Sequence, residues 1–121
     1  SIGGKFIEFI HTGGHTVATS LVYLPKEKIL FTGDNVLCNE HPYMSQANTR
    51  QWLAALAMIK RMDVEIVVPG HGPPTTPEAV DETKRYIEYV RAEVYKLVQQ
   101  GKGRKEVANI LAPNLLSIYP V

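Results

Sequence analysis

Short apolar runs separated by turn residues occupy the first third of the chain. The runs at 5–11, 16–24 and 29–32 are rich in Ile, Phe, Val, Leu and Thr, and most of these side chains fit the pleated surface of a β-sheet. Residues 25–28 form a polar turn between the second and third runs, and its first residue is a proline, which presets φ. The pattern predicts three strands, with the last two joined as a β-hairpin.

A polar segment at 35–47 predicts a loop, and the apolar period after it changes to that of a helix. Asn48 or Thr49 can cap the start of this helix with a side-chain oxygen. The apolar residues that share its buried face are Trp52, Leu53, Leu56, Ile59 and Met62. The nearly all-apolar run at 65–68 then predicts a short buried strand, which ends in a rigid loop of proline and glycine.

The last third of the chain has the spacing of two helices. A Thr-Pro pair at 76–77 predicts a helix start, with a capping oxygen followed by proline in the first turn, and this long helix stops at Gly101. A shorter helix is expected over 104–111, ended by Pro113, and residues 115–121 form an apolar tail with no clear period. The order of strands, helix, strand and two helices predicts one α/β layered unit.

Composition narrows the class of protein. The 121 residues fit a single domain, and 45% hydrophobic with 21% charged residues is ordinary globular usage. The sequence lacks an apolar run of about 18 residues, so we expect no membrane span. Its 13 basic and 12 acidic side chains lack the basic excess of a nucleic-acid binder. One cysteine, Cys38, excludes an intrachain disulfide and leans towards a reducing, cytoplasmic location.

Histidines and an aspartate lie beside glycines at the ends of the expected strands. His15 follows Gly13 and Gly14 between the first two strands, Asp34 follows the third strand, and His71 follows the fourth. Strand ends are where an α/β scaffold presents functional side chains, and imidazole and carboxylate are the ligand types of zinc and related hydrolytic metals. These residues could therefore converge on a metal.

Three phrases, in this order, resemble the C-terminal half of the metallo-β-lactamase superfamily: Gly14-His15-Thr16, Thr32-Gly33-Asp34 and Pro69-Gly70-His71-Gly72. The resemblance implies the C-terminal half of an αβ/βα sandwich and a metal-dependent hydrolase that acts on a small-molecule substrate. It implies two metal ions, usually zinc, with iron or manganese as alternatives.

The resemblance also implies a role for each residue. His15 would be a ligand of the first metal, His71 of the second, and Asp34 would bridge the two as the central catalytic group. In the family, the metals hold the water that attacks the substrate, and metal binding lowers its pKa from about 15.7 towards ~7.

The family's His-x-His-x-Asp-His motif, which supplies the other ligands, does not occur in this sequence. The chain also begins at Ser1 without an initiator Met, so we expect a processed or truncated product that holds half of the active site and is inactive alone. The alternative is a non-catalytic fragment or interaction module. The uncovered half of the sandwich predicts a homo-oligomer or association with the missing N-terminal half.

Three further polar residues are weaker candidates. His11 could orient His15, although a structural hydrogen bond explains it better. His41 could touch substrate, although a solvated loop histidine is the simpler interpretation. Asn35 could line the cleft beside the bridging aspartate, and a turn residue explains it equally well.

Overall fold

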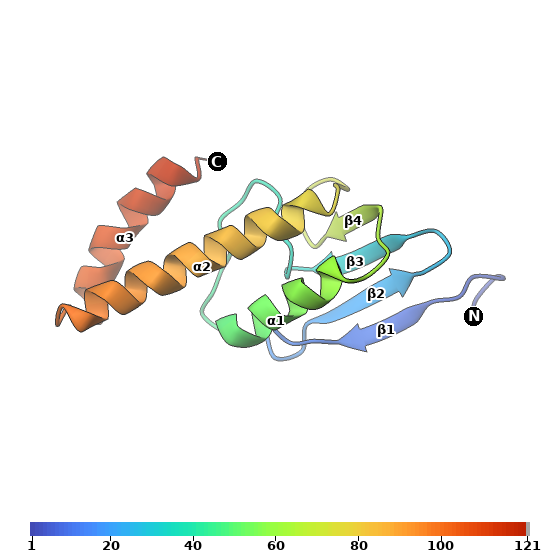
Figure 1. Cartoon of the computed structure of the whole chain (residues 1–121), viewed down its shortest axis with the longest axis horizontal. Helices are drawn as coiled ribbons and strands as arrows, with labels where there is room; N and C mark the ends of the chain where they lie inside the picture. Colours follow the sequence, from blue (N-terminus) through green and yellow to red (C-terminus); the bar gives the residue numbers. More distant parts are fainter. Residues whose placement is uncertain (121) are drawn as a thin grey trace.

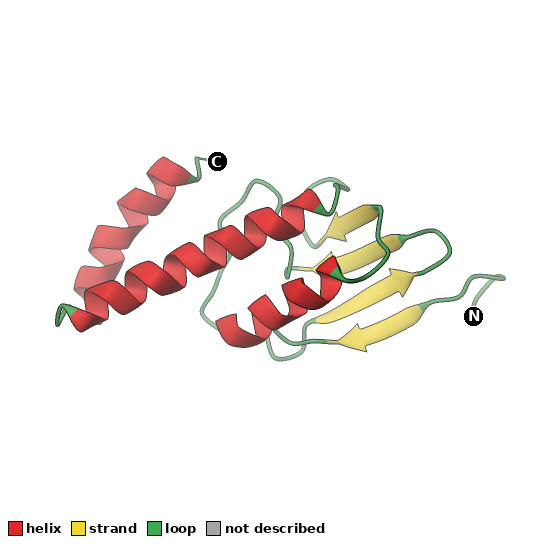
Figure 2. Ribbon diagram, in the orientation of Figure 1, coloured by secondary structure: helices red, strands yellow, loops and turns green. Residues whose placement is uncertain are grey.

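The computed structural model describes residues 1–120, over which a four-stranded sheet carries helices on one face (Figures 1 and 2). The strands are β1 (Glu8–His11), β2 (Ser20–Leu24), β3 (Ile29–Gly33) and β4 (Ile66–Pro69), and they lie in the sheet in that order. β1, β2 and β3 pair antiparallel, whereas β3 and β4 pair parallel. The α/β layered unit and the β2–β3 hairpin are as the sequence predicts.

The second strand begins four residues later than its apolar pattern predicts, at Ser20. Residues 16–19 form a turn in which the Thr16 N–H donates to the Thr19 hydroxyl at 3.0 Å and the Thr19 N–H donates to the Thr16 carbonyl at 3.3 Å. A threonine hydroxyl that bonds nearby backbone competes with strand pairing. The first strand also begins later than predicted, at Glu8, and Lys5 instead forms backbone hydrogen bonds with Ile2 in a tight turn.

Helix α1 (Thr49–Lys60) connects β3 to the parallel strand β4. Its predicted cap is confirmed, since the Asn48 side-chain oxygen accepts a hydrogen bond from the Gln51 N–H at 3.0 Å. Trp52 and Leu56 are completely buried on the face of α1 that meets the sheet.

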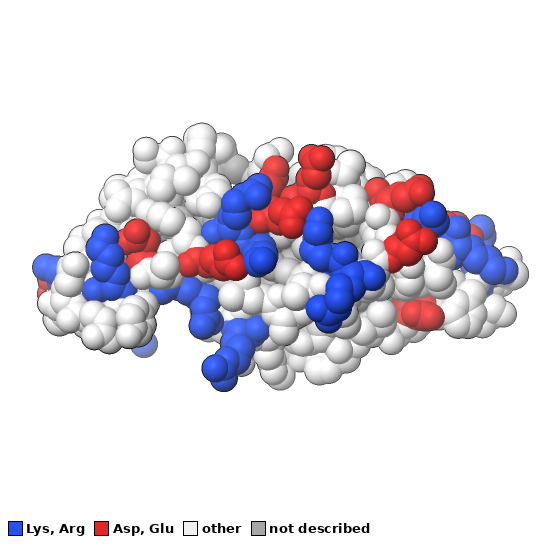
Figure 3. Space-filling model, viewed as in Figure 1, with Lys and Arg blue, Asp and Glu red and all other residues white. Residues whose placement is uncertain are grey.

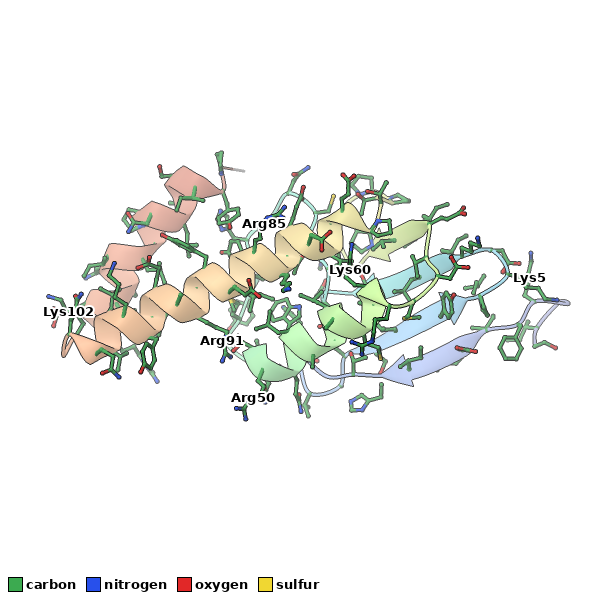
Figure 4. All side chains as sticks on the ribbon, in the orientation of Figure 1. Lys5, Arg50, Lys60, Arg85, Arg91 and Lys102 are labelled. Atoms are coloured by element: carbon green, nitrogen blue, oxygen red, sulfur yellow. The ribbon has the colours of Figure 1, made fainter. Side chains whose placement is uncertain are left out.

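The long helix α2 (Glu78–Gln99) runs across the sheet and beyond it, and α3 (Arg104–Ile118) turns back at its far end (Figure 1). The predicted threonine cap of α2 is wrong: Pro77 occupies the N-cap position and no side chain caps the helix. Besides their shared core, α1 and α2 are linked by an ion pair between Lys60 and Asp81 at 2.9 Å and by a hydrogen bond from Arg91 to Thr49. Lys60 and Arg91 are labelled in Figure 4.

The prediction that Pro113 ends the last helix is also wrong, since α3 continues through it to Ile118. Leu111 is buried, and Leu115 and Tyr119 pack against the core. Leu111 and Leu115 are four residues apart on one face of α3, and Tyr119 follows the helix directly, so the packing of these residues offsets the hydrogen bond that proline removes. The predicted apolar tail is therefore mostly the end of this helix, and residue 121 lies outside the described part.

The hydrophobic core lies between one face of the sheet and the helices. Leu21, Leu30 and Val67 point from β2, β3 and β4 into this core and are completely buried, as is Ile87 of α2. Strand residues alternate between the two faces, so the intervening positions point the other way.

The opposite face of the sheet is apolar and uncovered within residues 1–120. One cross-strand row consists of Phe9, Val22, Phe31 and Val68, and a second row consists of Leu24, Ile29 and Ile66. Phe9 is 78% exposed and Phe31 is 42% exposed. We call these seven residues the open sheet face.

The charged side chains do not form a field of one sign. Basic and acidic groups alternate over the face drawn in Figure 3, in keeping with the net charge of +1. In the described part of the chain, the helices are too short or too polar to cross a membrane.

Candidate metal centre

The three predicted ligands meet at one edge of the sheet. Asp34 directly follows β3, and His71 lies two residues beyond the end of β4. Because β3 and β4 are parallel, their carboxyl ends lie at the same edge. His15 reaches this edge from the turn between β1 and β2, so the fold brings together residues 56 positions apart.

The carboxylate of Asp34 faces one imidazole with each oxygen. Its Oδ1 lies 2.9 Å from His71 Nδ1, and its Oδ2 lies 3.9 Å from His15 Nδ1. The exposed fraction of the side chain rises from 14% for His15 to 34% for Asp34 and 67% for His71. The site thus runs from a sheltered histidine, through the shared carboxylate, to a histidine at the surface.

This donor set has the ligand chemistry of a metal site. Asp34 Oδ1 is hydrogen-bonded to His71 Nδ1 at 2.9 Å, and carboxylate oxygen and imidazole nitrogen are both ligand types of zinc. Within residues 1–120, no three His, Cys, Asp or Glu side chains are grouped closely enough to hold an ion by themselves. The arrangement therefore fits part of a metal centre.

Gly70 allows Asp34 to sit where it does. A Cβ atom at this position would lie 2.1 Å from Asp34 Oδ1 and 2.9 Å from the carbonyl carbon of Gly33. The Gly70 N–H also donates to the Gly33 carbonyl at 2.8 Å. A side chain at residue 70 would occupy the space that the carboxylate needs.

Residues 1–71 match the family model of the metallo-beta-lactamase superfamily, which is more than half of the chain. The chain belongs to the metallo-β-lactamase superfamily. The match ends at His71 and so includes all three predicted ligands.

Curated relatives carry related names. The chain is 25% identical over 114 residues to "Beta-lactamase-like protein 2 homolog" of Caenorhabditis elegans. This alignment covers 94% of the chain and 38% of the relative. It is 25% identical over 124 residues to "Lactamase-like protein aptB" of Emericella nidulans, with 98% of the chain and 40% of the relative covered. The chain thus spans well under half the length of these relatives.

Solved structures agree with the family and the fold. A metallo-beta-lactamase from Pontibacter korlensis has a TM-score of 0.66 and 31% identity, covering 73% of this chain and 44% of that one. The structure of TMB-1 has a TM-score of 0.64 and 29% identity, covering 75% and 47%. The α/β fold is that of part of a metallo-β-lactamase domain, as the sequence predicts.

Asn35, the residue after the central aspartate of this metallo-β-lactamase domain, is completely buried and does not line the cleft. Its Oδ1 accepts a hydrogen bond from the His15 N–H at 2.9 Å. Its Nδ2 donates to the Thr12 hydroxyl at 3.1 Å and to the Gly13 carbonyl at 3.0 Å. Its backbone carbonyl accepts from Trp52 Nε1 at 2.8 Å.

The other two histidines have different surroundings. His11 Nε2 lies 2.7 Å from the Val17 carbonyl oxygen, on the exposed side of β1. His41 Nδ1 lies 2.8 Å from the Tyr86 hydroxyl, and its Nε2 is buried without a hydrogen-bond partner among the described residues. Neither shows an ion-pair or hydrogen-bond contact with Asp34 in this part of the chain.

Sequence reasoning missed Glu40, whose Oε1 lies 3.8 Å from His71 Nδ1. Glu40 also lines a cavity of about 350 Å³ whose walls include Arg85, Tyr86, Ile118 and Tyr119. Burial raises the pKa of Tyr86, and the neighbouring Tyr119 adds to this rise. Glu40 lies in a polar loop without a motif, so no spacing in the sequence links it to His71.

Proposed function

We propose that this chain supplies His15, Asp34 and His71 as one half of the ligand set of a two-metal hydrolase. The observation that supports this proposal is the Asp34 carboxylate, which presents one oxygen to each imidazole. Membership of the metallo-β-lactamase superfamily supports a hydrolytic reaction. Zinc is the expected metal, with iron or manganese as alternatives.

The residues of this chain would hold and orient the metals. Bound zinc would lower the pKa of a water towards neutral, so that a strong base would not be needed. Asp34 would contribute one negative charge that offsets the repulsion between the cations. His15 is sheltered and fixed by its neighbours, whereas His71 lies at the open side, where Glu40 adds a second carboxylate within 3.8 Å.

The chain alone offers two ligands to each ion, and Asp34 is shared between them. A catalytic zinc usually has three protein ligands, and the His-x-His-x-Asp-His motif that would complete the set is not in this sequence. We therefore propose that the isolated chain binds zinc weakly and does not turn over substrate.

The substrate is proposed to be a small organic molecule. The cavity beside Glu40 has about 350 Å³, at the lower end of the range for ligand pockets, and Glu40 in its wall lies 3.8 Å from His71. A stretch of 71 residues is 30% identical to the Atrochrysone carboxyl ACP thioesterase of Aspergillus fumigatus, covering 59% of this chain and 16% of that protein. An acyl thioester is therefore the first substrate class to assay.

The proposed partner of the chain is an apolar surface that covers the open sheet face. That partner is either a second copy of the chain or the half of the fold that carries the remaining ligands. Seven apolar residues spread over four strands would then be removed from water.

A hydrolysis assay tests the proposal in a protein that joins this chain to a segment carrying the His-x-His-x-Asp-His ligands. Asp34→Ala should nearly abolish turnover, because it removes the shared ligand. His71→Ala should remove more of the second metal than of the first. His41→Ala is the control and should leave metal content unchanged.

The second candidate function is a non-catalytic interaction module, which the incomplete ligand set favours. Full activity in the Asp34→Ala protein would contradict the role of that residue. A joined protein that binds neither metal nor substrate would support the interaction module instead.

A further inference from the structure

We infer that Asn35 is a positioning residue that fixes His15 for metal binding. The inference rests on the proposed function of His15 as a ligand. Asn35 does not contact the expected metals; it acts through the backbone and the ring environment of His15.

The Asn35 amide has no spare hydrogen-bonding capacity towards solvent. It is completely buried, its oxygen accepts from the His15 N–H, and its two N–H groups donate to Thr12 and Gly13. An aspartate at this position would lose both N–H donors. It would also place a charged carboxylate oxygen near the Gly13 carbonyl oxygen, which lies 3.0 Å from Asn35 Nδ2. An uncharged amide of this length satisfies all three partners.

The same residue also fixes the surroundings of the His15 ring. The Trp52 indole N–H donates to the Asn35 carbonyl, and the edge of the Trp52 ring meets the His15 ring at 88°, with 5.4 Å between centroids. The side chain of Asn35 thus holds the His15 backbone, and its main-chain carbonyl holds the Trp52 ring that meets the His15 imidazole.

Gly14 shows how closely the loop is fitted to Asn35. Gly14 has a φ of +127°, and a Cβ at this position would lie 2.5 Å from Asn35 Oδ1. The Gly14 carbonyl accepts from the Asn48 N–H at 2.8 Å. Because Asn35 directly follows Asp34, the segment that carries the central carboxylate also sets the position of the first imidazole.

The test is a zinc titration of the full chain, followed by NMR at the imidazole signals of His15 and His71. Groups that orient metal ligands typically change metal affinity by about 10–100-fold. In Asn35→Ala, half-response of His15 should need at least about 10-fold more zinc than in the wild type. The response of His71 should change much less, because Asn35 does not contact it.

Two further variants separate positioning from loss of stability. Gly14→Ala forces the same loop away from Asn35 and should weaken the His15 response in the same direction. Thr83→Val is the matched control: Thr83 is 1% exposed and bonds Leu37 and Ala79, away from His15. It should destabilise the chain without raising the zinc requirement of His15.

The outcomes are distinct. The inference would be overturned if both histidines of the wild type respond to zinc and Asn35→Ala and Gly14→Ala titrate like the wild type. The proposed function would then remain intact. Equal weakening at His15 and His71 in Asn35→Ala would also overturn it, since that is the effect of general destabilisation. No zinc response at either histidine in the wild type would contradict both the inference and the proposed function.

Discussion

At the scale of single residues, the site depends on a glycine that has no side chain as much as on the side chains that would bind a metal. Asp34 can face both histidines because Gly70 has no side chain. The sequence predicts His15, Asp34 and His71 as ligands because each lies in a glycine-containing phrase, and the fold brings the three together. It does not find Glu40, which reaches His71 through the path of a loop, nor the buried role of Asn35, which depends on three long-range hydrogen bonds.

We predict that Gly70→Ala displaces Asp34 and destabilises the fold. The new Cβ would clash with the Gly33 backbone as well as with the Asp34 carboxylate. Rotation of the Asp34 side chain therefore cannot relieve the whole clash. Overpacking of this kind costs about 1–3 kcal/mol. Urea denaturation measures this loss, and zinc titration measures the effect on the site. Gly103→Ser is the control, because a Cβ there meets no atom within 4 Å; equal stability of the two variants would contradict the prediction.

The second residue-scale prediction concerns Tyr86, whose pKa is raised by burial and by Tyr119. Because the folded state holds this proton more tightly than the unfolded state, the stabilisation is fully present below about pH 10, the ordinary pKa of tyrosine. It is lost as the pH rises through the higher folded-state pKa. The free energy of unfolding should fall less steeply over this alkaline range in Tyr86→Phe than in the wild type. Tyr95→Phe, at an exposed position, should keep the wild-type slope.

At the scale of elements, the sequence predicts those features that depend only on residues close together in the chain. Short apolar runs between turn residues predict the strands, and Asn48 or Thr49 predicts the start of α1, because these signals act over a few positions. The Thr16–Thr19 turn and the helix through Pro113 are missed for different reasons. In the turn, the Thr19 hydroxyl accepts the Thr16 N–H in place of a hydrogen bond between strands. The helix continues past Pro113 because its residues are buried against other elements.

We predict that Pro113→Ala stabilises α3. The substitution restores a backbone N–H and relieves the clash with the preceding turn, and proline in a helix interior costs up to about 3 kcal/mol relative to alanine. Hydrogen exchange of the amides of α3 measures the gain, which should appear as stronger protection.

Pro77→Ala is the matched control, since Pro77 precedes the first residue of α2 and removes no interior helix bond. This variant should leave protection of α3 unchanged. Weaker protection of α3 in Pro113→Ala would show that proline at this position helps the helix to end or bend as it does.

At the scale of the whole molecule, the open sheet face is the apolar surface that the hydrophobic core does not bury. Burial of apolar surface is worth about 25 cal/mol per Å², so about 300 Å² left in water forfeits roughly 7 kcal/mol. The net stability of a domain is only about 5–15 kcal/mol. An uncovered face of this kind therefore favours association.

We predict that the chain associates through the open sheet face, either with itself or with the complementary half of the fold. Light scattering at micromolar concentration should show a mass above that of the monomer. Phe31→Lys should lower this mass, whereas Tyr95→Lys, an exposed apolar position on α2, should not. A cooperative, well-folded monomer with no other polypeptide bound would show that the chain needs no cover for this face.

If His15, Asp34 and His71 act together as metal ligands, equilibrium binding of zinc to the isolated chain depends on all three. The wild type should bind zinc weakly and retain less than one ion per chain after dialysis against a mild chelator. Alanine at His15, Asp34 or His71 should each lower the affinity by at least about tenfold, with Asp34→Ala the most affected, while His41→Ala binds like the wild type. Unchanged zinc affinity in all three ligand variants, or two tightly retained ions per wild-type chain, would contradict the account.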